Sequence, residues 1–290
     1  MLHGHGDDGY RQSHKIRADF STNVWYGGEP AGLKDYVFSQ WSAINRYPEV
    51  LAESLAARVA THHGVPPGQV LMSSGTTESI YLVAQAWAGQ HSTVITPAFA
   101  EYEDAGRLHG HELQFRAWGE LRPGLELLGA LVFVCNPNNP TGSVLAAGLL
   151  EDLLGTNPGT VFVLDEAFIE FTTHIQTAIP LLARFDNLLI LRSLTKAYAI
   201  PGLRLGYVVA SEKLIDRLTR GKAPWTVNAL PRRLATLSSS ISPACSPPPP
   251  SCWPTVPPSA RSWPKIAGSR FSPATRTTSW ATCSTARPPS

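Results

Sequence analysis

A lysine surrounded by hydroxyl groups is the strongest chemical signal in the sequence. Lys196 follows an apolar run at 188–192, with Ser193 and Thr195 before it and Arg204 eight residues after it. An amine that is desolvated and close to a cation has a lowered pKa and becomes nucleophilic. This setting suits an aldehyde that carries an anion and is held both covalently and by that anion. On its own, a lysine here would be interpreted as a solvated loop residue, but the longer motif favours chemistry.

A carboxylate stands at the end of a second apolar run. Asp165 follows residues 161–164, which have the composition of a buried strand. A buried carboxylate is costly unless it meets a positive partner. A protonated ring nitrogen is such a partner, and its proton makes the ring a better electron sink. An Asp that caps a helix is the alternative interpretation.

Two further runs end in residues that could bind a ligand. Asn139 lies in a Pro-Asn-Gly turn after residues 131–135, where its amide could donate to a ring oxygen, although a plain turn explains the same residues. Gly75 and Thr76 stand where a helix is expected to begin, and free N–H groups at a helix start form a phosphate cradle. A simple Ser/Thr cap is the alternative there.

Aromatic residues follow another apolar run. Phe99 and Tyr102 come after residues 93–96 and could stack on a flat ring. Core packing explains Phe99 equally well.

The elements that carry these residues alternate between two periodicities. Short β-branched or apolar runs predict strands, and longer amphipathic stretches between them predict helices. This βαβα order predicts an α/β domain with a buried, mostly parallel sheet. Ligands of such sheets bind at the carboxyl ends of the strands, where the residues above lie. The expected strands are 69–72, 93–96, 131–135, 161–164, 188–192 and 206–209, and the expected helices are 50–63, 77–88, 146–154 and 211–220.

Composition excludes several other classes of protein. The formal charge is +2, but residues 231–290 hold seven Lys and Arg and no acid, so residues 1–230 carry −5. No broad basic face for nucleic acid is expected. The longest apolar run, 127–135, is far short of the roughly 18 residues that a membrane helix needs. We expect a cytoplasmic protein with no membrane segment and no metal site, and we interpret Cys135 as a core residue.

The pattern changes after residue 230. Thirteen of the 25 prolines lie in 231–290, and hydrophobic periodicity is lost. Such a segment cannot bury enough apolar surface to offset the entropy of ordering, so disorder is predicted. A natural Pro/Ser-rich tail and a reading-frame shift both explain it. We therefore divide the chain into an N-terminal arm at 1–15, a large domain at 16–230 and this tail.

The motifs together resemble one known family. Residues 16–230 are similar to the fold-type-I pyridoxal-phosphate (PLP) enzymes, and within them to the histidinol-phosphate aminotransferases and threonine-phosphate decarboxylases. The resemblance implies that Lys196 forms a Schiff base with PLP. It implies a homodimer, because Tyr47 resembles a tyrosine that reaches the cofactor phosphate of the partner subunit. The other implied roles are Asp165 at the pyridine nitrogen, Asn139 at the ring oxygen, Tyr102 stacked on the ring, Gly75, Thr76, Ser193 and Arg204 at the phosphate, and His3, Gly4 and Asn23 at the substrate.

Fewer residues distinguish the two activities. Phe168 stands where the aminotransferases usually have Tyr, and residues 3–6, 96–102, 199–204 and 224–228 also look closer to the decarboxylases. This resemblance implies decarboxylation of L-threonine O-3-phosphate to (R)-1-amino-2-propanol phosphate in cobalamin biosynthesis. A histidinol-phosphate-type aminotransferase is the alternative. A PLP-binding fragment without turnover is another, because the small C-terminal domain of the family and its carboxylate-binding arginine are not recognisable in 231–290.

Overall fold

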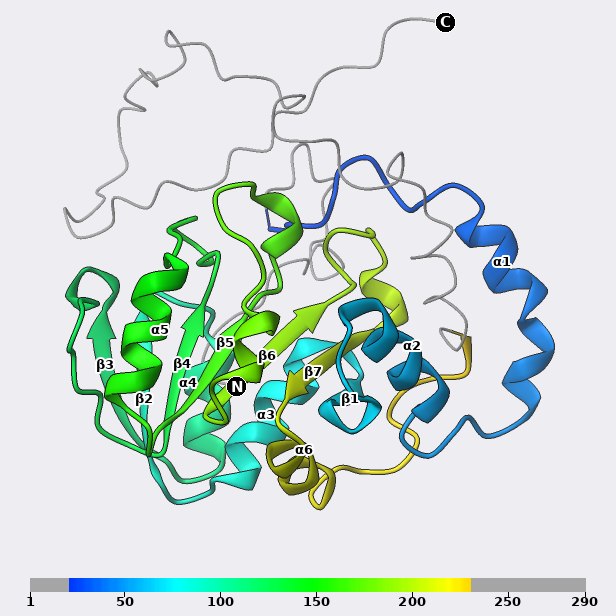
Figure 1. Cartoon of the computed structure of the whole chain (residues 1–290). Helices are drawn as coiled ribbons and strands as arrows, with labels where there is room; N and C mark the ends of the chain where they lie inside the picture. Colours follow the sequence, from blue (N-terminus) through cyan, green and yellow to red (C-terminus); the bar gives the residue numbers. More distant parts are fainter. Residues whose placement is uncertain (1–20, 231–290) are drawn as a thin grey trace, which may run out of the picture.

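A seven-stranded sheet forms the centre of the protein. The computed structural model describes residues 21–230, shown as coloured ribbon in Figure 1. The strands lie in the order β1-β7-β6-β5-β4-β2-β3. Their bounds are β1 Val70–Ser73, β2 His91–Thr96, β3 Glu112–Ala117, β4 Leu131–Cys135, β5 Val161–Asp165, β6 Leu188–Ser193 and β7 Gly206–Ala210.

Most neighbouring strands are parallel. The run from β3 through β2, β4 and β5 to β6 is parallel throughout, whereas β7 is antiparallel to both β6 and β1. Strands β4, β6 and β7 are buried along their whole length, as expected for strands covered on both faces. The predicted α/β class and the mostly parallel sheet are confirmed.

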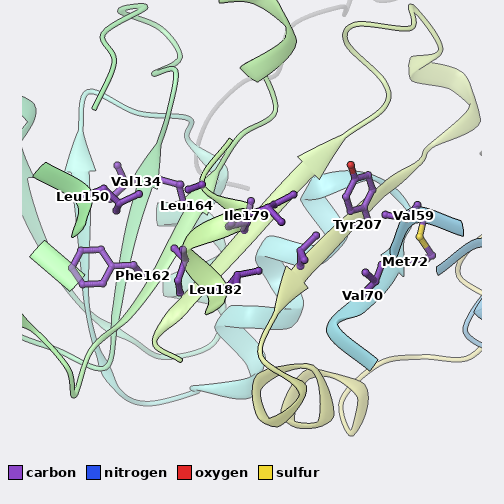
Figure 2. Close-up of a cluster of buried hydrophobic side chains, with 14 of the residues drawn as sticks. Val59, Val70, Met72, Val134, Leu150, Phe162, Leu164, Ile179, Leu182 and Tyr207 are labelled. Atoms are coloured by element: carbon purple, nitrogen blue, oxygen red, sulfur yellow. The ribbon is translucent and has the colours of Figure 1, made fainter. Parts of the chain in front are cut away.

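Helices cover both faces of this sheet and make three layers. The helices are α1 Leu33–Ser39, α2 Glu53–His63, α3 Gly75–Ala86, α4 Glu101–Leu108, α5 Ala147–Thr156 and α6 Glu212–Thr219. One apolar cluster joins α2 and α5 to the sheet (Figure 2), and a second joins α3, α4 and α6 to the opposite face. Strand residues alternate between the two clusters: Leu188 and Ile190 belong to the first, Leu189 and Leu191 to the second.

Some elements differ from the prediction. Strand β3 was not expected, because it lies at the sheet edge and its residues are mostly exposed, so it lacks an apolar run. Helix α4 was not expected either. Helix α3 begins at Gly75, two residues earlier than predicted, which places Gly75 and Thr76 inside its first turn.

The margins of the described region are less covered. Leu33 is the buried residue of α1, which lies at the edge of the fold in Figure 1. No helix within residues 21–230 is long and apolar enough to cross a membrane. The predicted arm at 1–15, with His3 and Gly4, and the predicted tail at 231–290 lie outside the described residues.

Candidate cofactor site

A buried carboxylate stands at the carboxyl end of β5. Asp165 is 3% exposed. The Tyr102 hydroxyl donates to its Oδ2 at 2.8 Å, and the Ala167 amide donates to its Oδ1 at 2.9 Å. Burial raises the pKa of Asp165, while these two hydrogen bonds and the positive charge of Lys196 act to lower it. The arrangement suits a carboxylate that faces a cation.

Tyr102 has a different environment from the one expected. Its side chain is fully buried, its ring stacks on Phe133 at 5.4 Å between centroids, and the Phe99 ring lies nearly perpendicular to it at 5.9 Å. The residue lies in the first turn of α4, an element that the sequence did not indicate, and its ring packs against β4. Tyr102 therefore supports Asp165 through its hydroxyl, and its place on the face of a bound ring stays a prediction.

The turn that carries Asn139 is fixed next to Asp165. Cys135 ends β4 and lies in register with Asp165, and its thiol sulfur accepts a hydrogen bond from the backbone N–H of Asn139 at 3.3 Å. The Asn136 side chain makes two hydrogen bonds with Leu145, which close the turn. Burial raises the pKa of Cys135 to about 12, so the thiol stays neutral. Cys135 is thus a core residue with a second role in placing Asn139.

The start of α3 lies against an arginine. Gly75 has φ +80°, and a Cβ there would lie 2.6 Å from Nη2 of Arg204. A Cβ on Gly206 would meet the backbone of Gly75 and Thr76 at 2.9 Å. Only glycine permits both approaches. The helix start and the guanidinium together form a cradle for an anion.

Register in the sheet brings the lysine loop to this cradle. Ser193 and Ser73 both pair with Gly206, from the two neighbouring strands. The Ser193 and Thr195 hydroxyls lie 2.7 Å apart just before Lys196. Residues from Ser73 to Gly206 that lie at strand ends therefore meet at the carboxyl ends of the parallel strands.

Asn23 and Tyr47 lie in the N-terminal segment of the described chain, and only Asn23 is close in sequence to a residue that contacts the lysine loop. The Trp25 amide donates to the Lys196 carbonyl at 2.9 Å, which brings the exposed Asn23 close to the lysine loop. Tyr47 is 83% exposed, and its ring lies 5.1 Å from that of Trp225. The side chain of Tyr47 is therefore open to contact from outside this chain.

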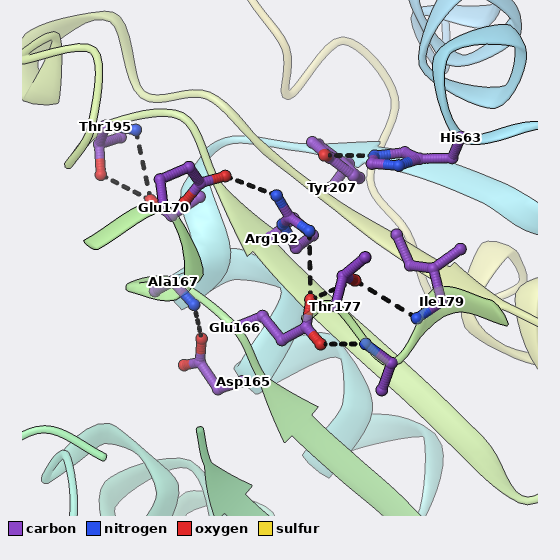
Figure 3. Close-up of polar contacts among 12 residues, drawn as sticks. His63, Asp165, Glu166, Ala167, Glu170, Thr177, Ile179, Arg192, Thr195 and Tyr207 are labelled. Atoms are coloured by element: carbon purple, nitrogen blue, oxygen red, sulfur yellow. Dashed lines mark hydrogen bonds and ion pairs between the residues drawn. The ribbon is translucent and has the colours of Figure 1, made fainter. Parts of the chain in front are cut away.

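An ion-pair network that sequence reasoning missed begins at Glu166, the residue after Asp165 (Figure 3). The Arg192 Nη1 lies 3.1 Å from Oε2 of Glu166, and its Nη2 pairs with Glu170. Thr177 and the Ala178 amide donate to Glu166 at 2.7 Å each. A polar residue inside the apolar run of β6 was the available signal. The network holds the 166–178 loop to the sheet.

These residues fit PLP. The glycine-lined cradle next to Arg204 suits a phosphate, the carboxylate of Asp165 suits a protonated pyridine, and Lys196 supplies the amine for covalent attachment. The fit rests on the charges of these side chains and on the close approaches at the glycines, all at one end of the strands.

Comparison with known proteins agrees with this fit to PLP. Residues 30–242 match the family described as aminotransferase class I and II. Threonine-phosphate decarboxylase of Salmonella typhimurium is 39% identical over 227 residues, which is 73% of this chain and 62% of that protein. Histidinol-phosphate aminotransferase of a Geobacillus strain is 34% identical over 223 residues, 72% of this chain and 60% of that protein.

A solved structure shows the same similarity. The L-threonine-O-3-phosphate decarboxylase of Porphyromonas gingivalis superposes with a TM-score of 0.73 at 35% identity, covering 79% of this chain and 71% of that one. The chain spans about three fifths of the length of the curated relatives it matches.

Proposed function

Because the chain belongs to the class I and II aminotransferase family, whose members depend on PLP, we propose that it decarboxylates L-threonine O-3-phosphate to (R)-1-amino-2-propanol phosphate. The similarity to the Salmonella threonine-phosphate decarboxylase carries this proposal. By the same similarity, the product serves cobalamin biosynthesis. The substrate is a small phosphorylated amino acid.

The proposed cofactor residues follow from the site. When bound, PLP supplies an electron sink for the pair left by a bond broken at the substrate's Cα. The chain's residues hold and tune it. We assign Lys196 to covalent attachment, Gly75, Thr76, Ser193 and Arg204 to the phosphate, Asn139 to the ring oxygen, Asp165 to the ring nitrogen, and Tyr102 to the ring face.

Two residues have proton roles. Asp165, as a carboxylate, stabilises a proton on the pyridine nitrogen, and Tyr102 and Ala167 keep its oxygens aimed. Carbon dioxide would leave and a proton would take its place on Cα; Lys196, freed from covalent attachment when the substrate amine replaces it, would donate that proton as an ammonium. Such general acid catalysis typically contributes about 10²–10⁴-fold.

We infer that an aromatic cluster of Phe168, Phe171 and Trp25 favours decarboxylation over transamination. Phe168 is partly buried, its ring lies 6.0 Å from Phe171, and Phe171 lies 6.3 Å from Trp25, whose amide binds the Lys196 carbonyl. An apolar wall disfavours a carboxylate more than it disfavours neutral carbon dioxide. It also offers no phenol at residue 168.

A homodimer is part of the proposal. An exposed side chain such as that of Tyr47 can reach a cofactor phosphate in a partner subunit. Exposed Phe38, Trp41 and Ile44 lie in the same N-terminal region and suit burial against another chain. His3, Gly4 and Asn23 remain the proposed substrate residues.

The alternative activity is a histidinol-phosphate-type transamination, which the 34% identity to the Geobacillus enzyme supports. A PLP-binding chain without turnover is the third possibility, since the chain matches about three fifths of its relatives.

The test starts with the purified chain and PLP. Borohydride reduction followed by peptide mass mapping is expected to find a pyridoxyl group on Lys196 and none in Lys196→Ala, with exposed Lys213→Ala as the matched control. The chain is then given L-threonine phosphate, or histidinol phosphate with 2-oxoglutarate.

The outcomes separate the three possibilities. Carbon dioxide and aminopropanol phosphate in equal amounts support the decarboxylase, whereas a keto product with glutamate supports the aminotransferase. Bound PLP without turnover supports the fragment. A pyridoxyl group on Lys196→Ala at the wild-type level would refute the site.

A further inference from the structure

A buried lysine lies beneath the start of α3. Lys222 follows α6, and its side chain has no exposed surface. Its Nζ donates to Oε1 of Glu78 at 2.7 Å and to the Thr226 hydroxyl at 2.6 Å. The other carboxylate oxygen of Glu78 accepts a hydrogen bond from the Ser74 amide. The ammonium is thus connected, through one carboxylate, to the residue directly before Gly75.

The position of Glu78 creates an electrostatic problem for an anion site. A carboxylate in the first turn stabilises a helix, because it faces the positive end of the macrodipole. The same carboxylate repels a phosphate that uses the neighbouring Gly75 and Thr76 amides. Glu78 is 23% exposed, so solvent screens its charge only in part. A cation in contact with Glu78 removes this repulsion.

The segment that carries Lys222 also touches two other parts of the site. The Trp225 amide donates to the Val50 carbonyl at 2.9 Å, three residues after Tyr47. The Asn228 side chain donates to the Leu203 carbonyl at 2.9 Å, one residue before Arg204. Residues 222–228 therefore hold together the α3 start, the Tyr47 region and the arginine loop.

We propose that Lys222 is a positioning residue for the cofactor phosphate. Its ammonium neutralises Glu78 and fixes the α3 start within hydrogen-bonding contact of residues 222–228. This inference rests on the proposed phosphate role of Gly75 and Thr76. Lys222 itself does not touch the cofactor. Its effect is on the phosphate group alone, and pyridoxal, which lacks the phosphate, is insensitive to it.

The experiment compares PLP with pyridoxal on the full chain. Lys222→Met replaces the buried ammonium by an unbranched apolar side chain that packs in similar space. We expect Lys222→Met to weaken PLP binding about tenfold, from the unmasked Glu78 charge, and pyridoxal binding less than about twofold. Lys213→Met, on the exposed side of α6, is the matched control and leaves both affinities unchanged.

A second variant tests the charge directly. Glu78→Gln combined with Lys222→Met leaves no buried charge, and we expect it to bind PLP within about threefold of wild type. Glu78→Gln alone removes the repulsive charge and is expected to bind PLP at least as tightly as wild type. This single variant keeps the test valid if Lys222→Met does not fold, which thermal unfolding reports.

Three results would overturn the inference: unchanged PLP affinity in a folded Lys222→Met, equal losses for PLP and pyridoxal, or weaker PLP binding by Glu78→Gln. Failure of the proposed function is a separate result, because then Lys196→Ala and wild type would bind PLP equally before any Lys222 variant is compared.

Discussion

Two adjacent carboxylates at the end of β5 are both buried, but one is paired with a cation and the other accepts hydrogen bonds from neutral groups. Asp165 is 3% exposed and Glu166 1%. Burial raises the pKa of both. Glu166 contacts the guanidinium of Arg192, whereas Asp165 accepts hydrogen bonds from a neutral phenol and a backbone amide. The charge of Glu166 is compensated inside the domain.

The difference separates a structural group from a functional one. A buried charge with a full set of partners stabilises the local conformation and has little capacity for a ligand. A buried carboxylate held by neutral donors keeps its attraction for an added cation, which the proposed pyridine supplies. Chain neighbours on opposite sides of one strand end can thus have unrelated roles.

Removing Arg192 is expected to have the largest effect on stability. Arg192→Met leaves Glu166 buried without its cation, and we expect the free energy of unfolding to fall by about 3–5 kcal/mol. Urea denaturation measures this. Arg184→Met breaks the exposed pair with Glu151 and is expected to cost less than about 1 kcal/mol. Equal losses in the two variants would contradict a structural role for the buried pair.

Neutral isosteres at the two positions sharpen the comparison. Glu166→Gln weakens a charge-assisted contact and is expected to cost about 1.5–3 kcal/mol of stability. Asp165→Asn is expected to change stability by less than about 1 kcal/mol, because burial disfavours the charge that is removed and the Tyr102 hydroxyl can turn to accept from the new amide.

Cofactor binding is expected to show the reverse order. Asp165→Asn is expected to weaken PLP binding about 10- to 100-fold, the equivalent of one charged hydrogen bond, and Glu166→Gln by much less. Denaturation curves and PLP titrations on the same two proteins give both orders. Parallel losses of stability and affinity in both variants would remove the distinction.

The smallest expected effect concerns His63, on the Arg192 side of the sheet. His63 lies 2.8 Å from the Tyr207 hydroxyl, and burial together with the charge of Arg192 lowers its pKa to about 4. As pH falls below 6.5, the unfolded chain takes up a proton that the folded chain does not, so stability falls between pH 6.5 and about 4.

We expect His63 to account for about 1 kcal/mol of this loss between pH 7 and pH 5, since partial exposure of the side chain reduces the effect. Chemical denaturation of wild type and His63→Gln at the two pH values measures it. The pH-dependent loss is expected to be smaller in His63→Gln. The same loss in both proteins would show that another group is responsible.

Much of the fold was predictable because apolar periodicity records burial directly. The six expected strands match β1, β2, β4, β5, β6 and β7 to within about two residues at each end, because each has an apolar or β-branched run. Strand β3 and helix α4 were missed, since an exposed edge strand and a short helix with three acids in its first turn lack that signal.

The sequence by itself determined the chemistry available at the site. Residue types and spacing indicated Lys196, Asp165, Asn139 and Arg204, because strand-end positions and glycine-flanked motifs are local properties of the chain. They also indicated the cofactor class through the resemblance.

Only the tertiary structure decided how these groups are supported. The contacts of Tyr102 with Asp165, of Arg192 with Glu166 and of Lys222 with Glu78 join residues 26 to 144 positions apart. Such contacts depend on which elements pack side by side and on the order of strands in the sheet, and no periodicity within one segment encodes them. For this reason the sequence indicated Tyr102 for the ring face, whereas its hydrogen bond with Asp165 emerged only from the packed fold.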